Sequence, residues 1–296
     1  MNNIKLFLGD IKQTYTKNRF VFINGNDMEC ILRFFGATKD DLDSIKIVSN
    51  SLADDPTLPF RKSKNGRFEI NFQEDQVHRL KFQPFILSKE EDFVRYDSGM
   101  VRKFRGIGDD LQLNTAFQAL LKFKSFMIQD VLVRKRPNLD YSANRYVSTV
   151  FNLRTITTPK LLGEPALEGV HSDGVDHTMT VLLDAKNLTQ DSAITFVHDI
   201  REQNGLRYDE CNPDYVLSQV RHTHFLDTLL IIDHERKHSL SPVFLENENH
   251  IATRDMLIFF TRKSTLSMHI SNTYDSFDKH QELPISFFLQ NELEKN

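Results

Sequence analysis

Residues 168–184 read EGVHSDGVDHTMTVLLD and place histidines and carboxylates directly ahead of a run that resembles a β-strand. The second part of the stretch, HTMTVLLD, begins with polar and apolar residues in alternation, which is the period of two expected for a strand. In the first part, one residue separates His171 from Asp173. In an extended segment this spacing puts both side chains on the same face, as two ligands of one metal ion require.

Similar runs follow one another along the second half of the chain. They are short, rich in β-branched and aromatic residues, and separated by Gly, Pro, Asn and Asp, which is typical of strands joined by turns. The runs are RYVSTVFNLRTI (145–156), HTMTVLLD (177–184), SAITFVHD (192–199), LDTLLIIDH (226–234) and RDMLIFFTRK (254–263). Because they do not alternate with helical patterns, they favour a mainly β, antiparallel sandwich or barrel over βαβ units.

One helix is predicted ahead of these strands, within residues 109–132. Apolar side chains recur there at steps of three and four and form one face; they are Leu113, Phe117, Leu120, Leu121, Met127 and Val131. Asp109 and Asp110 suit the positive N-terminal end of this helix. We expect a single domain over residues 1–296, in which residues 1–94 form a helical or irregular cover without a catalytic role, 95–265 the core, and 266–296 an extension.

The composition is that of an ordinary globular protein, with 296 residues, 40% hydrophobic and 26% charged. The 24 phenylalanines and the absence of tryptophan predict a core built on Phe rings. A formal charge of −4 gives no electrostatic reason to expect nucleic acid or membrane partners. The basic segments at 61–67, 101–105 and 133–137 are dispersed, and we interpret them as solvated faces. Two cysteines, with no leader or spanning segment, predict a cytoplasmic protein.

A third metal ligand has to come from a distant segment. His238, in DHERKHSLSPVF (233–244), follows the apolar run LDTLLIID. Two imidazoles and one carboxylate form the facial triad typical of non-haem iron(II) oxygenases, which leaves coordination positions open for a 2-oxo acid and O2. Arg254 begins a later run, and its guanidinium matches a carboxylate of such a co-substrate.

Other readings of these residues stay open at this point. The H-x-D spacing alone also fits a hydrogen-bonded turn. Three further histidines compete with His238 as the third ligand; they are His222, His224 and His234. His177 stands at the start of a predicted strand, where it would form a pocket wall, lie in solvent or support a ligand.

The ordered set resembles the iron(II)- and 2-oxoglutarate-dependent dioxygenases, including bacterial free L-amino-acid hydroxylases such as L-isoleucine 4-hydroxylase. The matching pieces are GMVRKF (99–104), FNLRTI (151–156), PALEGVHSDGVDHTMTVLLDAKNL (165–188), HSLSPV (238–243) and RDMLIFF (254–260). The chain departs from the pattern at LTQDSAITF (188–196), where such enzymes usually have a Gly-Gly-rich turn. This departure concerns the edge of the substrate pocket and not the metal ligands.

The resemblance implies a double-stranded β-helix, or jelly-roll, core in which His171, Asp173 and His238 bind Fe(II) and Arg254 binds the distal carboxylate of 2-oxoglutarate. The implied activity is hydroxylation of an unactivated C–H bond with O2, coupled to conversion of 2-oxoglutarate to succinate and CO2. A carboxylate at Asp173 favours hydroxylation over halogenation. The rival reading is a non-oxidative metal-binding cupin-type protein, an isomerase or a sensor, which would not need Arg254.

A small-molecule substrate, most of all a free L-amino acid, would need a cation for its carboxylate and an acceptor for its ammonium group. Candidates for the cation are Arg154, Arg102 and Arg105, and Asp176 is a candidate for the acceptor. The sequence does not choose among them, and it indicates neither the carbon attacked nor the oligomeric state.

Overall fold

The structure, a computed structural model, describes residues 2–87, 89 and 94–289. Its helices are α1 (Asn2–Asn18), α2 (Gly25–Phe34), α3 (Lys39–Ser44), α4 (Asp109–Gln112) and α5 (Thr115–Ile128). Its strands are β1 (Phe20–Ile23), β2 (Ala53–Asp54), β3 (Arg61–Asn71), β4 (Gln76–Leu80), β5 (Leu139–Asp140), β6 (Arg145–Thr157), β7 (His177–Lys186), β8 (Ile194–Asp199), β9 (Val216–Arg221), β10 (Thr228–Ile232), β11 (Arg236–Leu240), β12 (Ala252–Arg262), β13 (Ser264–Thr265) and β14 (Ser286–Phe288).

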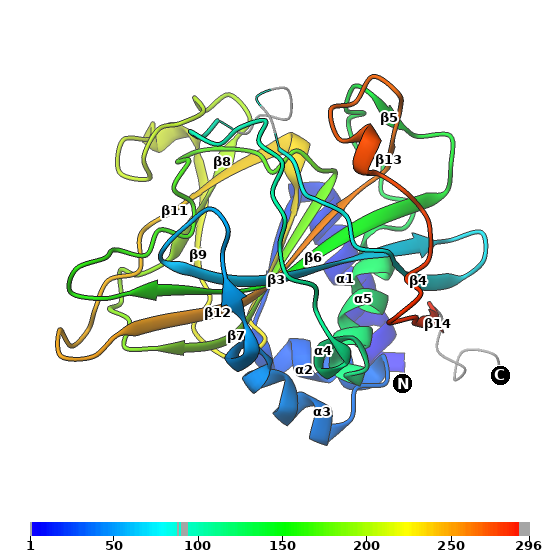
Figure 1. The fold of residues 1–296 in the computed structure, drawn as a ribbon, viewed down its shortest axis with the longest axis horizontal. Helices are drawn as coiled ribbons and strands as arrows, with labels where there is room; N and C mark the ends of the chain where they lie inside the picture. Colours follow the sequence, from blue (N-terminus) through cyan, green and yellow to red (C-terminus); the bar gives the residue numbers. More distant parts are fainter. Residues whose placement is uncertain (1, 88, 90–93, 290–296) are drawn as a thin grey trace.

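A nine-stranded antiparallel sheet forms the centre of the molecule (Figure 1). Its strand order is β1-β10-β7-β12-β6-β3-β4-β14, with β2 paired to β3. A second antiparallel sheet has the order β11-β8-β9. Each of the five runs predicted as strands overlaps a strand of these sheets, namely β6, β7, β8, β10 and β12. The prediction of a mainly β, antiparallel fold is confirmed.

The small sheet faces one side of the large sheet, and a cavity separates the two. Met256, Ile258 and Phe260 of β12 line this cavity, whereas the alternate residues Leu257 and Phe259 belong to the hydrophobic core on the other side. Because side chains of a strand alternate between faces, β12 is covered on both sides. This double burial explains why RDMLIFF is a continuous apolar run without the alternation of a half-exposed strand.

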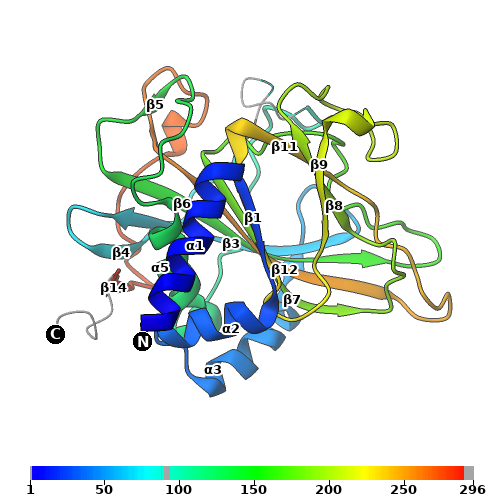
Figure 2. The ribbon, with the colours of Figure 1, turned by 180° about the vertical axis from the view of Figure 1, so that it is seen from behind.

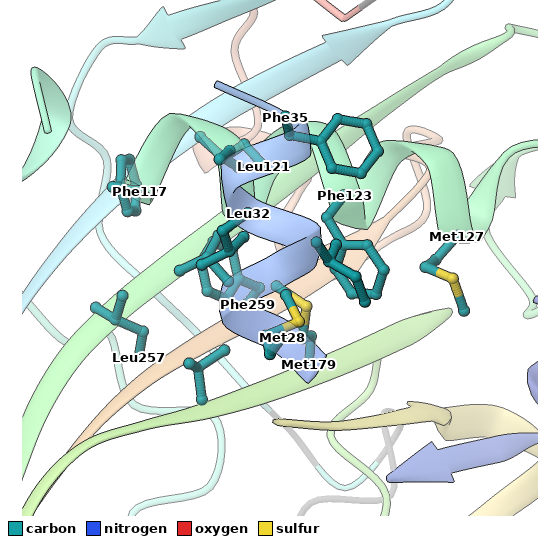
Figure 3. Close-up of a cluster of buried hydrophobic side chains, with 14 of the residues drawn as sticks. Met28, Leu32, Phe35, Phe117, Leu121, Phe123, Met127, Met179, Leu257 and Phe259 are labelled. Atoms are coloured by element: carbon teal, nitrogen blue, oxygen red, sulfur yellow. The ribbon is translucent and has the colours of Figure 1, made fainter. Parts of the chain in front are cut away.

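Helices cover the outer face of the large sheet, where α1 and α2 lie in front of the strands in Figure 2. Figure 3 shows side chains of α2 and α5 meeting residues of the sheet. The ring of Phe117 in α5 stacks on Phe259 of β12 at 6.0 Å between centroids and is 5.4 Å from the ring of Phe68 in β3. All three rings are fully buried, so the expectation of a Phe-based core is confirmed.

Replacing Phe117 by alanine is expected to lower the free energy of unfolding by about 3–5 kcal/mol, because it removes a buried ring and leaves a cavity against the sheet. Denaturant unfolding followed by circular dichroism measures this change. Leu132→Ala is the matched control, since this side chain is 85% exposed and its loss should cost less than about 0.5 kcal/mol. Equal stability of the two variants would contradict the packing described here.

The single helix predicted over residues 109–132 is divided in the structure. α4 ends at Gln112, and α5 begins at Thr115 after Asn114, whose side-chain oxygen accepts hydrogen bonds from the backbone N–H groups of Ala116 and Phe117. Asn is favoured at this capping position because it satisfies N–H groups that lack a partner within the helix. Leu113 therefore falls in the break and is 54% exposed, which corrects its assignment to the apolar face of that helix.

The first 90 residues contribute strands as well as helices. The segment 61–67 is part of β3, which lies between β6 and β4. Its interpretation as a solvated face is wrong for Arg67, which is 6% exposed and pairs with Asp275 at 2.6 Å. β1 pairs with β10 at the edge of the same sheet.

Cys30 and Cys211 are both free thiols.

No helix in the described part of the chain has the length and apolar character needed to cross a membrane.

Candidate active site

The cavity between the two sheets has a volume of about 120 Å³. The large sheet lines it with side chains that include Phe151, Thr178 and Met256, and the small sheet with Thr195, His238 and Leu240. The loop between β6 and β7 adds Glu168, His171 and Asp173. Polar side chains of both sheets and of this loop therefore share the cavity with an apolar wall on the large sheet.

The three side chains predicted to bind a metal ion meet in this cavity. Ligand atoms of His171, Asp173 and His238 all lie within 4.8 Å of one another. Nε2 of His171 is 3.4 Å from Oδ1 of Asp173, and Nε2 of His238 is 3.7 Å from Oδ2 of the same carboxylate. The three residues are at most 8% exposed. Two imidazole nitrogens and one carboxylate oxygen are a donor set that suits Fe(II).

Backbone pairing holds the two imidazoles side by side. His171 and His238 exchange two N–H···O hydrogen bonds of 3.0 Å, and their ring centroids are 4.3 Å apart. Nδ1 of His171 lies 2.8 Å from the carbonyl oxygen of Gly169. A hydrogen bond donated there leaves Nε2 with the lone pair that a metal ion needs, an arrangement common among metal-binding histidines.

Asp173 is held by groups around it. The hydroxyl of Thr178 donates to Oδ2 of Asp173 at 2.8 Å. The backbone N–H of Asp173 donates to both carboxylate oxygens of the fully buried Asp233, at 2.9 and 2.8 Å. Asp233 also accepts from the N–H of Val175, so it fixes the turn that contains the H-x-D motif. Asp233 was not among the site residues predicted from the sequence.

The pKa values describe a site that carries one proton in the absence of metal. Burial lowers the pKa of His171, but Glu168 and Asp173 outweigh this effect and raise it to about 10. Burial and the neighbouring cationic His171 lower the pKa of His238 to about 4. The pKa of Asp173 falls to about 2, because His238 and His171 outweigh its burial. Since ligands bind metal in their deprotonated form, a divalent cation would replace this proton, and the three residues fit Fe(II).

Arg254 lies in the same cavity and is 3% exposed. Among the residues that the structure describes, none offers it a carboxylate partner, and its Nε has no hydrogen bond. Burial, together with the nearby Arg221, lowers the pKa of Arg254 to about 10, so the guanidinium stays cationic at neutral pH. A buried charge is costly unless it is paired, so this position is suited to an anionic ligand.

The candidates for substrate contacts have different positions. Arg102 lines the cavity, with Nε 3.3 Å from Oδ2 of Asp97. Arg154 does not line it, because it alternates with the cavity residue Thr155 along β6 and pairs bidentately with Asp255 at 2.6 Å. The structure thus gives Arg154 an ion pair on the opposite face in place of a substrate contact.

Arg105 and Asp176 also lie away from the cavity. Arg105 is exposed. Asp176 is fully buried, accepts a 2.6 Å hydrogen bond from the hydroxyl of Tyr141 and another from the backbone N–H of Lys263. Its carboxylate is used within the fold, which corrects its assignment as an acceptor for substrate.

The competing histidines stand outside the group of three ligands. Nε2 of His222 is 3.1 Å from the hydroxyl of Thr180, and His224 is exposed. Nδ1 of His234 is 2.9 Å from Nη1 of Arg136. His177 is fully buried, with Nδ1 2.9 Å from the hydroxyl of Tyr15, and is neither a pocket wall nor solvated.

Several cavity residues were not predicted from the sequence. Arg61 and Phe85 come from the first 94 residues, for which no catalytic role was predicted, and Arg95 follows this segment directly. Glu168 is within the opening stretch, three residues before His171, and Oε1 of Glu168 is 3.2 Å from Nε2 of that histidine. Glu168 stands within one of the sequence segments that resemble the dioxygenases, and this position was the signal that could have identified it.

Comparisons with known proteins agree with this geometry. The chain is 47% identical to a solved structure of the Fe(II)/α-ketoglutarate-dependent dioxygenase TqaL, with a TM-score of 0.85 over 98% of this chain and 97% of the other. The bifunctional enzyme flvA of Aspergillus flavus is 43% identical over 94% of this chain, which spans 34% of that protein's length. IDO from Bacillus thuringiensis is 13% identical with a TM-score of 0.62 over 86% of this chain and 95% of the other, a likeness of fold alone.

The structural matches confirm the double-stranded β-helix fold. The expected membership in the bacterial free L-amino-acid hydroxylases is not confirmed, and the family is shown by similarity to TqaL and flvA. Residues 46–260 match the family described as 2OG-Fe dioxygenase. Since this segment covers most of the chain, the protein belongs to the 2OG-Fe dioxygenase family, whose members are enzymes that use Fe(II) and 2-oxoglutarate.

Proposed function

We propose that the enzyme hydroxylates an unactivated C–H bond of a free L-amino acid and releases succinate and CO2 from 2-oxoglutarate. The observation that carries the proposal is the buried Arg254, which shares one cavity with His171, Asp173 and His238. A cupin-type isomerase or sensor would use the three ligands without a buried guanidinium. The family match also favours the dioxygenase over that alternative.

In this proposal His171, Asp173 and His238 would hold Fe(II) at the wall of the cavity. When bound, Fe(II) supplies the oxidising chemistry with O2. Arg254 binds the distal carboxylate of 2-oxoglutarate, and burial strengthens this pairing because little water screens it. The hydroxyl of Thr178 and the backbone contacts of Asp233 keep the Asp173 carboxylate in place.

The remaining wall of the cavity supports an amino acid with an apolar side chain. A hydrophobic cluster lines it; its members are Phe85, Phe104, Phe151, Leu153, Met256, Ile258 and Phe260. Arg102 stands beside this cluster and is the candidate that remains for the substrate carboxylate. Because Arg61 and Phe85 also line the cavity, we assign residues 1–94 and the core to a single catalytic domain.

The experiment that tests this function is a panel of free L-amino acids offered to the purified enzyme with Fe(II), 2-oxoglutarate and O2. We expect at least one apolar amino acid to gain one oxygen by mass spectrometry, with one succinate formed for each product. Turnover only on peptide, carrier-bound or nucleic-acid substrates, with none on any free amino acid, would overturn the proposal.

Arg102→Leu is expected to raise KM for the amino acid roughly 30-fold or more, because it removes one partner of a buried charge pair. Arg105→Leu is the matched control, since Arg105 is exposed and its replacement should leave KM within about twofold. Steady-state kinetics at saturating 2-oxoglutarate measure both. A larger rise in KM for Arg105→Leu than for Arg102→Leu would place the substrate carboxylate at Arg105 and contradict its assignment to Arg102.

A further inference from the structure

A second group of potential metal ligands lies outside the cavity, at the small sheet. Apart from the predicted Fe(II) ligands, the described residues form one further group of three side chains whose ligand atoms all lie within 4.8 Å of one another; they are His198, Glu202 and Cys211. None of the three lines the cavity. His198 belongs to β8, whereas Glu202 and Cys211 belong to the loop between β8 and β9.

The strand register separates this group from the active site. Val197 of β8 is paired with His238 of β11, and residues paired in this way share a face of the sheet. His238 lines the cavity, so His198, the next residue along β8, points to the opposite face. Ser239 follows His238 and points the same way as His198, which places its hydroxyl 2.9 Å from Nε2 of that histidine.

The side chains of the group are close enough to share a metal ion. Sγ of Cys211 lies 3.9 Å from Nε2 of His198. In a tetrahedral zinc site, with Zn–N of about 2.0 Å and Zn–S of about 2.3 Å, two such ligand atoms lie roughly 3.5 Å apart. His198 and Glu202 are buried, at 0% and 3% exposed, and Cys211 is half-buried. The observed spacing therefore needs only a small adjustment to hold an ion.

The imidazole of His198 is not fully used by the fold. Its Nδ1 is buried and has no hydrogen-bond partner among the described residues, which is uncommon for a buried polar atom. Burial lowers the pKa of His198, so the ring is neutral at neutral pH and keeps a lone pair on one of its nitrogens. A neutral imidazole is the form that binds metal.

The charges around the group favour a cation. Burial and the carboxylate of Glu202 raise the pKa of the Cys211 thiol to about 11, and Asp209 and Glu210 act in the same direction. Carboxylates that disfavour a bare thiolate attract a metal ion to the same place. Lys237, which donates to the backbone carbonyl oxygen of Glu202, is a nearby cation that opposes this effect.

We propose that His198, Glu202 and Cys211 form a second metal site, which binds Zn(II) and is separate from the predicted Fe(II) site. Thiolate and imidazole ligands suit zinc, and water completes the four ligands. Without metal the Cys211 thiol donates to the carbonyl oxygen of Arg207 at 3.1 Å. On binding, the thiol proton is released to solvent and the sulfur forms the Zn–S bond.

A metal ion at this site would tie the β8–β9 loop to the small sheet. The same loop supports the turn that carries the H-x-D motif. The N–H of Val170 donates to the carbonyl oxygen of Leu206, and the N–H of Gly205 donates to the carbonyl oxygen of Val170, both at 2.8 Å. A Cβ at Gly169 would lie 2.4 Å from that oxygen of Leu206, so the turn and the loop are closely packed. The second metal would therefore have a structural role beside the active site.

The test uses Co(II) as a probe for zinc, because a thiolate ligand gives tetrahedral Co(II) an intense charge-transfer band in the near ultraviolet. The predicted Fe(II) ligands contain no sulfur, so Co(II) bound to them gives no such band. Co(II) is titrated without O2 into the enzyme loaded with Fe(II). We expect a saturable thiolate band in the wild type, and excess Zn(II) should abolish it.

Cys211→Ser should give no thiolate band, and Glu202→Gln should need roughly 10-fold or more Co(II) to reach half of it. Cys30→Ser is the matched control, since Cys30 is exposed on α2 and its replacement should leave the band unchanged. Circular dichroism checks that each variant is folded. The predicted Fe(II) ligands are the same in all three variants, so the proposed function is tested separately.

A wild type without a thiolate band overturns the inference, as does a band that persists in Cys211→Ser. A band that is lost in Cys30→Ser also overturns it, because the sulfur ligand would then be the other cysteine. A Glu202→Gln variant that binds Co(II) like the wild type removes Glu202 from the ligand set and contradicts the site as described.

Discussion

Alanine at His171, Asp173 or His238 is expected to abolish turnover and to leave the protein folded. Removal of a group that merely supports a metal ligand commonly costs 10–100-fold in affinity or activity, so removal of a ligand should cost more than about 100-fold. The three residues lie together in one cavity, and no other residue of the described chain joins their group. Product formation and bound iron are measured for each variant, with circular dichroism as the check on folding.

His224→Ala is the control for these variants, because His224 is exposed and lies outside the cavity. It should keep activity within about twofold of the wild type. An active His238→Ala together with an inactive His224→Ala would show that the third ligand has been assigned to the wrong histidine.

Arg254→Leu is expected to weaken 2-oxoglutarate binding by roughly 30-fold to several-thousand-fold, which corresponds to about 2–5 kcal/mol for one side of a buried charge pair. The three predicted metal ligands are unchanged in this variant, so Fe(II) should still bind. The Michaelis constant for 2-oxoglutarate and the affinity for Fe(II), measured on the same preparation, separate the two effects.

Arg221→Leu is the matched control for Arg254→Leu. Arg221 is close enough to lower the pKa of Arg254, but its guanidinium donates to the backbone carbonyls of Ser192 and Thr189 outside the cavity. Its loss should leave 2-oxoglutarate affinity within a few-fold of the wild type. Unchanged 2-oxoglutarate binding in Arg254→Leu would contradict the role given to Arg254 and favour a cupin-type protein.

The strands of the second half could be predicted because their apolar and β-branched runs end at clear turn residues. The run RDMLIFF shows both the strength and the limit of this signal. It identifies β12 but does not reveal which face meets the cavity, because both faces are buried. Because of the same ambiguity, Arg154 was predicted to contact the substrate. In the structure it alternates with the cavity residue Thr155 and pairs with Asp255 on the other face of the sheet.

The first 90 residues were harder to interpret because local pattern does not determine their positions. β3 is rich in Arg, Lys and Asn, which read as a solvated face, yet it is an inner strand whose Arg67 is neutralised by Asp275, more than 200 positions later. Pairings of this kind exist only in the folded chain. The contacts of Glu168 and Asp233 were missed for a similar reason, since each involves residues brought together by the turn around Asp173.

Adding Fe(II) and then 2-oxoglutarate to the enzyme without O2 and recording the visible spectrum tests most directly whether Arg254 binds 2-oxoglutarate beside the three predicted metal ligands. We expect a weak charge-transfer band in the wild type only after both additions. The band should be absent from Asp173→Ala at any 2-oxoglutarate concentration, because the metal is not held. In Arg254→Leu the band should appear only at 2-oxoglutarate concentrations roughly 30-fold or more above those that the wild type needs. A wild type that gives no band with both additions, or an Arg254→Leu variant that titrates like the wild type, would contradict the account.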